Sequence, residues 1–207
     1  AGNKHWEGRD KEKKMCGRYY VDDETAREIE KLVRDLDRKL QIEHTGDVFP
    51  SQNATIIKGQ TNHLAAEQMK WGFLGFEKGK LLINARAESA LERKTFRDSL
   101  QHRRCIIPAK GFYEWDKSKE KFSYERKDAP VLFMAGCYNR YQGEERFVIL
   151  TTEANPSVAP VHHRMPLILD PEELENWVLD DKATEYILHK TPVLLRSSTE
   201  YEQMRLF

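Results

Sequence analysis

Apolar residues recur at helical spacing in one early segment of the chain. Asp22 or Asp23 can cap the start of a helix, and the apolar positions after it lie three or four residues apart: Ala26, Ile29, Leu32, Val33, Leu36 and Leu40. Such a stripe is typical of an amphipathic helix with one buried face. We therefore expect a helix here that packs one side against the core.

Short runs of β-branched and aromatic residues follow, separated by turn-forming residues. They are ATII at 54, LLIN at 81, RCIIPA at 104, FYEW at 112, FSY at 122, VLFMAGCY at 131, RFVILTT at 146 and LLR at 194. Many short strands at these intervals are typical of a curved, mostly antiparallel sheet or barrel.

Two further helices are predicted among these strands. TFRDSLQH at 95 is a short helical segment, and Asp170-Pro171 supplies a capping residue followed by proline at the first helical position, opening a helix through Leu179. The predicted fold class is α+β: a mostly antiparallel, curved, β-barrel-like core flanked by short helices.

The composition is that of one soluble globular domain. Hydrophobic residues make up 39% and charged residues 33% of 207 residues, which excludes the low hydrophobicity of disordered chains. Three widely spaced cysteines, Cys16, Cys105 and Cys137, indicate neither a disulfide framework nor a metal site, and no cofactor is expected. Neither a signal peptide nor a membrane span is evident, so we expect a cytoplasmic, nucleoid-associated monomer.

Charge is unevenly distributed, although the net charge is zero. Residues 92–127 contain 11 Lys/Arg against 6 Asp/Glu, or +5, whereas residues 143–185 contain 3 against 10, or −7. The basic stretch also carries Phe112, Tyr113 and Trp115, which suits a nucleic-acid backbone and its bases. A solvated charged surface explains the charge alone equally well.

Cys16 lies in the sequence Met15-Cys16-Gly17-Arg18. If translation starts at Met15, trimming of the methionine leaves a free amine on Cys16, and residues 1–14 are an extraneous extension before a single domain at 15–207. The amine and thiol, with pKa values of about 8 and about 8.5, can then close a thiazolidine ring on an aldehyde. The alternative is a genuine charged tail before an internal Cys16.

Three further polar residues have chemical potential in mostly apolar contexts. They are Asn84 in LINAR, Glu114 between Tyr113 and Trp115, and His162 in VHHRMP. A desolvated Glu114 has a raised pKa and suits general acid–base catalysis, and His162 can move protons near neutral pH. Taken singly, each is more often a structural residue.

Taken together, MCGR at 15–18, LINARAE at 82–88, GFYEW at 111–115 and HHRMP at 162–166 resemble the SRAP family, the SOS response-associated peptidases. The resemblance runs from Met15 to about Phe207. It implies a compact β-barrel-like fold that binds single-stranded DNA and crosslinks covalently to abasic sites, shielding them from strand cleavage. It also implies self-processing peptidase activity and weak abasic-site lyase activity in DNA repair.

The resemblance also implies roles for individual residues. Cys16 is the nucleophile, Asn84 positions it, Glu114 transfers protons, and His162 helps to open the sugar ring. The residues expected to contact DNA are Arg18, Arg86, Pro50, Trp71, Trp115 and Arg164. Cys105 and Cys137 are expected to be buried, inert thiols.

The chain departs from the family pattern in one respect, and two alternative functions remain. Cys16 is internal in the chain, and an internal cysteine has no free amine, so ring closure requires removal of the preceding residues. The first rival is a cysteine peptidase that uses Cys16, His162 and either Asn84 or Glu114. The second is a non-catalytic module that binds single-stranded or modified DNA.

Overall fold

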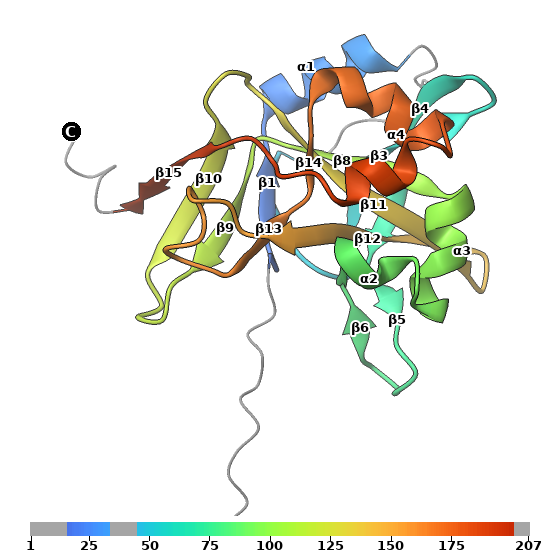
Figure 1. Cartoon of the computed structure of the whole chain (residues 1–207), viewed down its shortest axis with the longest axis horizontal. Helices are drawn as coiled ribbons and strands as arrows, with labels where there is room; N and C mark the ends of the chain where they lie inside the picture. Colours follow the sequence, from blue (N-terminus) through green and yellow to red (C-terminus); the bar gives the residue numbers. More distant parts are fainter. Residues whose placement is uncertain (1–15, 34–44, 201–207) are drawn as a thin grey trace, which may run out of the picture.

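A computed structural model describes residues 16–33 and 45–200 of the chain. Its central feature is a closed ring of five strands, in which the last strand pairs back to the first (Figure 1). In ring order the strands are β12 (Glu144–Glu153), β4 (His63–Trp71), β3 (Asn53–Gln60), β8 (Arg104–Ala109) and β11 (Leu132–Tyr141). Neighbours are antiparallel except β12 and β4.

Short strands extend this barrel at its rim. β7 (Asn84–Arg86) and β13 (Arg164–Pro166) both pair with β12, and β14 (Ile168–Leu169) pairs with β11. Opposite Thr151 of β12 lie Arg86 on one side and Pro166 on the other. The NARAE and HHRMP segments are therefore brought to the same end of β12, although about 75 residues of sequence separate them.

A second sheet lies beside the barrel, at the left of Figure 1. Its strand order is β15 (Leu195–Thr199), β10 (Lys121–Arg126), β9 (Gly111–Trp115), β1 (Tyr19–Val21) and β2 (Gly46–Val48). A separate hairpin, β5 (Phe73–Leu74) and β6 (Leu81–Leu82), projects from the lower end of the molecule in the same view.

Strand alternation divides the buried residues into two clusters. Ile56, Cys105, Ile107 and Ile149 belong to a cluster that fills the barrel and reaches the inner face of the second sheet. Their neighbours along the strands, such as Ile57 and Ile106, point outward and pack with residues from the helices. Successive side chains of a strand point to opposite faces, and both faces of the barrel strands are covered here.

The helices cover the outside of the barrel. They are α1 (Asp23–Leu32), α2 (Ala87–Ala90), α3 (Lys94–His102), α4 (Leu174–Leu179), preceded by the 3-10 turn Pro171–Glu173, and α5 (Thr184–Leu188). Asp22 caps α1, its carboxylate accepting the Thr25 amide at 2.9 Å. No helix in the described ranges has both the length and the apolar character needed to cross a bilayer.

The structure confirms the predicted fold class and the eight strand-forming runs. The cap at Asp22 is confirmed as well, but α1 ends at Leu32: Val33, an expected helical position, has an extended backbone with φ −97° and ψ 129°. The expected positions Leu36 and Leu40 lie outside the described residues. In the third predicted helix, the Asp170 amide donates to Glu173 Oε2 at 2.8 Å, and the first turn is 3-10 rather than α-helical.

Candidate active site

Cys16 and Glu114 meet in the interior of the protein. The Cys16 backbone N–H donates a hydrogen bond to Glu114 Oε1 at 2.7 Å, and both residues are buried. Strand β9 explains the position of the carboxylate. Phe112 and Glu114 point inward, whereas Tyr113 and Trp115 lie partly exposed on the opposite face. Among the residues that the structure describes, the Cys16 N–H is the one hydrogen-bond donor to the Glu114 carboxylate.

The surroundings of this pair alter both protonation equilibria. Burial raises the pKa of Glu114 to about 8, despite the opposing effect of the Cys16 N–H. Burial, together with the Glu114 charge, raises the pKa of the Cys16 thiol well above its usual range. At neutral pH Glu114 can therefore hold a proton, and the thiol is not preformed as a thiolate.

The Cys16 backbone is itself unusual. Its φ angle is +41°, in the left-handed region that residues with a Cβ rarely adopt. Such conformations cost of order 1–3 kcal/mol and persist where the surrounding structure enforces them. Here Cys16 is completely buried, in the core cluster that also contains Tyr19, Phe112 and Tyr124 of the second sheet.

Asn84 and His162 lie near the rim of the barrel. Asn84 opens β7 opposite Ile149, and it is partly exposed. His162 stacks on His163, with 4.6 Å between ring centroids, and its Nδ1 lies 3.1 Å from the amide nitrogen of Arg164. When His162 is neutral with Nδ1 as the acceptor, Nε2 carries the proton.

An ion pair joins the two sequence motifs that carry these residues. Arg164 donates through Nη1 and Nη2 to the two carboxylate oxygens of Glu88, at 2.7 and 2.9 Å. Arg164 Nη2 also donates to the Thr151 carbonyl oxygen at 2.7 Å. The guanidinium expected to contact DNA is therefore engaged within the protein, and a phosphate would have to compete with Glu88 for it.

The other residues expected to contact DNA have different environments. Arg86 is exposed, and Pro50 and Trp115 are partly exposed. Trp71, in contrast, is completely buried, and its indole N–H donates to the Ile83 carbonyl at 3.0 Å. The prediction that Trp71 contacts DNA is therefore wrong for this structure, because the ring presents no face to a base.

Arg18 lies on the outer side of the second sheet among aromatic rings. Its guanidinium carbon is 4.6 Å from the ring centroid of Phe49 and 5.2 Å from that of Trp115. Arg18 Nη1 is also 3.4 Å from Asp47 Oδ2. Arg18 is thus positioned by rings and a carboxylate together, while it remains partly exposed.

Phe76 is an exposed residue that sequence reasoning missed. It lies between β5 and β6 and its side chain is 99% exposed, the highest value among the large hydrophobic residues described. The run GFEKGK around it contains no strand or helix pattern that would single it out. An exposed aromatic ring beside lysines is suited to stacking on an unpaired base.

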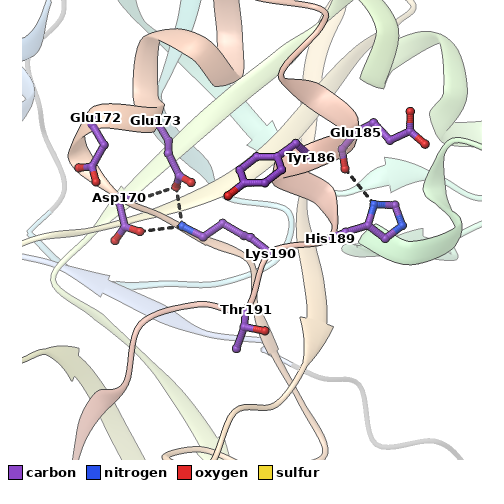
Figure 2. A pocket seen from close by; sticks show the side chains of 8 residues that line it. All are labelled: Asp170, Glu172, Glu173, Glu185, Tyr186, His189, Lys190 and Thr191. Carbon is purple, nitrogen blue, oxygen red and sulfur yellow. Dashed lines mark hydrogen bonds and ion pairs between the residues drawn. The ribbon is translucent and has the colours of Figure 1, made fainter.

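A hollow lined by charged residues lies elsewhere on the surface. It has a volume of about 740 Å³ and is bordered by acidic residues, including Asp170, Glu173 and Glu185 (Figure 2). Lys190 bridges two of them, with Nζ 2.8 Å from Asp170 Oδ2 and 2.5 Å from Glu173 Oε2. This acidic surface would repel phosphates and is separate from the Cys16 site.

Cys105 and Cys137 are both completely buried, which confirms the predicted burial of these two thiols. Burial raises the pKa of Cys137 to about 12 and that of Cys105 well above its usual range. Within 16–33 and 45–200, no three His, Cys, Asp or Glu side chains are grouped so as to hold a metal ion.

Known proteins share both sequence and fold with this chain. The profile described as "SOS response associated peptidase (SRAP)" matches residues 15–205. "Abasic site processing protein YoqW" of Bacillus subtilis is 35% identical over 190 residues, which cover 83% of each chain. "Abasic site processing protein YedK" of Escherichia coli is 31% identical over 176 residues, covering 79% of each. A crystal structure of a Bordetella bronchiseptica protein, 23% identical, has a TM-score of 0.74 and covers 89% of this chain and 99% of that one.

Proposed function

Because the chain belongs to the SOS response associated peptidase (SRAP) family, we propose that it binds single-stranded DNA and crosslinks to abasic sites through Cys16. The relatives named above as abasic site processing proteins support the substrate. The observation that carries the mechanism is the 2.7 Å contact between the Cys16 nitrogen and Glu114 Oε1. In a chain that begins at Cys16, that same nitrogen is the α-amine.

The reaction starts at the aldehyde of the open-chain sugar. The neutral amine of Cys16 attacks the carbonyl carbon, and loss of water from the resulting carbinolamine leaves an imine. The thiol then adds to the imine carbon, with its proton passing to the imine nitrogen, and a five-membered thiazolidine forms. The net change is release of one water and no change in oxidation state.

Glu114 is suited to the proton transfers in this sequence. With its pKa raised to about 8 by burial, it can accept the proton that the amine nitrogen loses after its attack and return one to the departing hydroxyl near neutral pH. His162 would act as the acid that opens the closed sugar, and Asn84 would orient Cys16. Arg18 and Arg86 would contact phosphates, with Pro50, Trp115 and Arg164 near the strand.

The thiazolidine accounts for protection of the DNA strand. An imine at the abasic carbon promotes β-elimination, which cleaves the strand and is the proposed weak lyase activity. Ring closure by the thiol removes the imine and so protects the strand from cleavage. The amine forms the first covalent bond to the abasic site. The protein would act as a monomer in the cytoplasm, associated with the nucleoid.

The rival function of a general cysteine peptidase has less support. A peptidase thiol needs a substantial thiolate fraction, whereas the buried Cys16 thiol has a raised pKa. Peptidase chemistry confined to the bond before Cys16 is a narrower proposal, since hydrolysis of that bond generates the amine that the crosslink requires.

A comparison of two versions of the chain tests this function. A version that begins at Cys16, after trimming of Met15, should give an SDS- and heat-resistant adduct with single-stranded DNA carrying one abasic site. The chain with residues 1–14 attached should give none while it remains intact, because the Cys16 nitrogen is then an amide. Equal adduct yields from both, with the longer one verified by intact mass, would refute the aminothiol mechanism.

A further inference from the structure

A pocket between α3 and α5 plays no part in the proposed chemistry. It has a volume of about 410 Å³, and Leu100, which is completely buried, and Leu91, which is partly buried, supply its apolar part. The exposed side chains around it are polar: Gln101, His102, Asp181 and Glu185. Helix α3 lies at the right of Figure 1, whereas the second sheet lies at the left. An apolar hollow with a few polar groups around it is the usual form of a binding site.

Thr184 contributes a buried hydroxyl to the wall of this pocket. The residue is 6% exposed, and its Oγ1 has no hydrogen-bond partner in the described part of the chain. A buried hydroxyl without a partner destabilises the protein, and such groups are rare in native structures. A hydroxyl can both donate and accept, so a peptide N–H or C=O in the pocket would supply the missing hydrogen bond.

The walls of the pocket are held in place by Arg104. Its buried guanidinium donates to the carbonyl oxygens of Leu100 at 2.8 Å and of Trp177 at 2.5 Å. It also donates to Asp181 Oδ1 at 2.6 Å. These bonds tie α3 to α4 and to the turn that precedes α5. The pocket is therefore formed before any ligand binds, and the charge of Arg104 is used within the protein.

The pocket continues into the acidic hollow of Figure 2, because Glu185 borders both. Five carboxylates line the two together: Asp170, Glu172, Glu173, Asp181 and Glu185. Two cations, Arg104 and Lys190, stand against these five, so the charge is −3 with neutral histidines. Both cations are already paired with carboxylates of this surface. Tyr186, which is 77% exposed, adds a ring that can contact a Lys or Arg side chain. The surface therefore favours a cationic partner.

We propose that the pocket and the acidic hollow together bind a basic peptide segment of a partner protein. One apolar side chain of the segment lies in the pocket against Leu91 and Leu100, and its backbone pairs with Thr184 Oγ1. The Lys or Arg side chains that flank it lie against Glu185 and the other carboxylates. A free polyamine would leave the apolar pocket unused, and these carboxylates repel nucleic acid. None of these residues belongs to the proposed crosslinking site.

Two synthetic peptides that differ at one position test the pocket in the whole protein. Each has Lys and Arg on both sides of a central residue, which is Leu in one peptide and Ser in the other, and both have blocked ends. The Leu peptide should bind about 10- to 150-fold more tightly, as expected for burial of one Leu side chain. Amide chemical shifts give both affinities and should change at Leu100 and Thr184 during the titration. Equal affinities would overturn the proposal, because charge alone attracts both peptides.

Thr184→Val separates a binding role of the hydroxyl from a structural one. Valine keeps the shape of the side chain and removes the hydroxyl that lacks a partner, so the free protein should lose no stability. Affinity for the Leu peptide should fall about 2- to 10-fold through loss of one hydrogen bond. An unchanged affinity in the folded variant would refute the proposed pairing with the peptide backbone.

Glu185→Gln tests the charge of the same surface and should weaken binding of both peptides. Glu30→Gln is the matched control, because it removes an exposed carboxylate from α1 and should leave both affinities unchanged. Equal losses in the two variants would mean that the peptides respond only to net charge, which would contradict docking at this surface. Adduct yield with abasic DNA, measured on the same proteins, reports separately on the proposed function.

Discussion

The backbone nitrogen of Cys16 lies 2.7 Å from Glu114 Oε1, although 98 positions separate these residues in the sequence. Because of this contact, the buried Glu114 carboxyl is placed to exchange protons with the Cys16 nitrogen rather than with the Cys16 sulfur. A general acid–base group at that position acts on amine attack and on loss of water. It is therefore expected to affect imine formation more than thiol addition.

Glu114→Gln should slow crosslinking while keeping most of the DNA affinity. The amide can still accept the Cys16 N–H but cannot exchange a proton, and general acid–base groups contribute about 10²- to 10⁴-fold. Single-turnover rates of adduct formation on denaturing gels measure the effect. An unchanged rate would leave Glu114 with a purely structural role.

Glu114 should also make stability depend on pH. Its pKa is about 8 in the folded protein but near the ordinary value of about 4.5 when unfolded, so between these values the folded state binds the extra proton. Stability should therefore fall as pH rises from about 4.5 to about 8 and level off above. Thermal unfolding of wild type and Glu114→Gln across this range measures it. The difference between the two proteins should shrink or reverse in favour of the variant as pH rises, and a parallel pair of curves would contradict the raised pKa.

Cys16→Ser in the version that begins at residue 16 should separate the two halves of the chemistry. The serine keeps the amine, so borohydride should trap an imine and strand cleavage should increase. The stable adduct should be lost, because a hydroxyl closes the ring far less readily than a thiol. Cys137→Ala is the control, since that thiol is completely buried in another cluster and should leave adduct yield unchanged.

Glu88→Gln should weaken the link between the NARAE and HHRMP segments. Arg164, whose side chain is only 12% exposed, would lose its two-point contact with the carboxylate. Because Glu88 is 41% exposed, the expected loss of stability is modest, about 1 kcal/mol. Chemical denaturation measures this loss. If the ion pair positions His162, the crosslinking rate of Glu88→Gln should fall as well. Arg164→Lys keeps the charge without the two-point geometry, so its crosslinking rate should lie between those of wild type and Glu88→Gln.

DNA affinity should fall steeply with salt and should favour single strands. Phosphate contacts by Arg18 and Arg86 release counterions, so affinity should drop between about 50 and 200 mM salt. Fluorescence anisotropy with single-stranded and duplex oligonucleotides of equal length gives both quantities. Equal affinities for the two, or affinity indifferent to salt, would count against the proposed binding mode.

Local patterns predicted the barrel-like fold class and most of its strands, but not which strands pair to close the barrel. The runs at 104, 131 and 146 are strands because β-branched and aromatic residues dominate them, and Asp22 caps a helix as its position indicates. Strand β4 escaped prediction, since HLAAEQMKW mixes alanine and charged residues that favour no strand. Its place is fixed by pairing with β3 and β12, which is a tertiary interaction.

The candidate site was likewise only partly predictable from the sequence. A glutamate between aromatic residues on a strand indicated a desolvated carboxyl, and Glu114 is 3% exposed. The sequence could not indicate that the partner of Glu114 is a backbone nitrogen. Every residue except proline has the same backbone N–H, so the order of side chains does not show which N–H a carboxylate will meet. Trp71 was misassigned for a related reason: only the closed barrel shows that its ring points into the interior.

The left-handed φ of Cys16 has a consequence for the bond that precedes it. That torsion is defined by the carbonyl carbon of residue 15, so it ceases to exist when the bond to Cys16 is cut. Release of about 1–2 kcal/mol of backbone strain corresponds to about a 5- to 30-fold shift of the hydrolysis equilibrium. The new ammonium group would also make a charge-assisted contact with Glu114 when that carboxyl is ionised, stronger than that of the amide. If the bond before Cys16 is cut as proposed, the fold would thus stabilise the cut chain more than the uncut one and shift the hydrolysis equilibrium toward it.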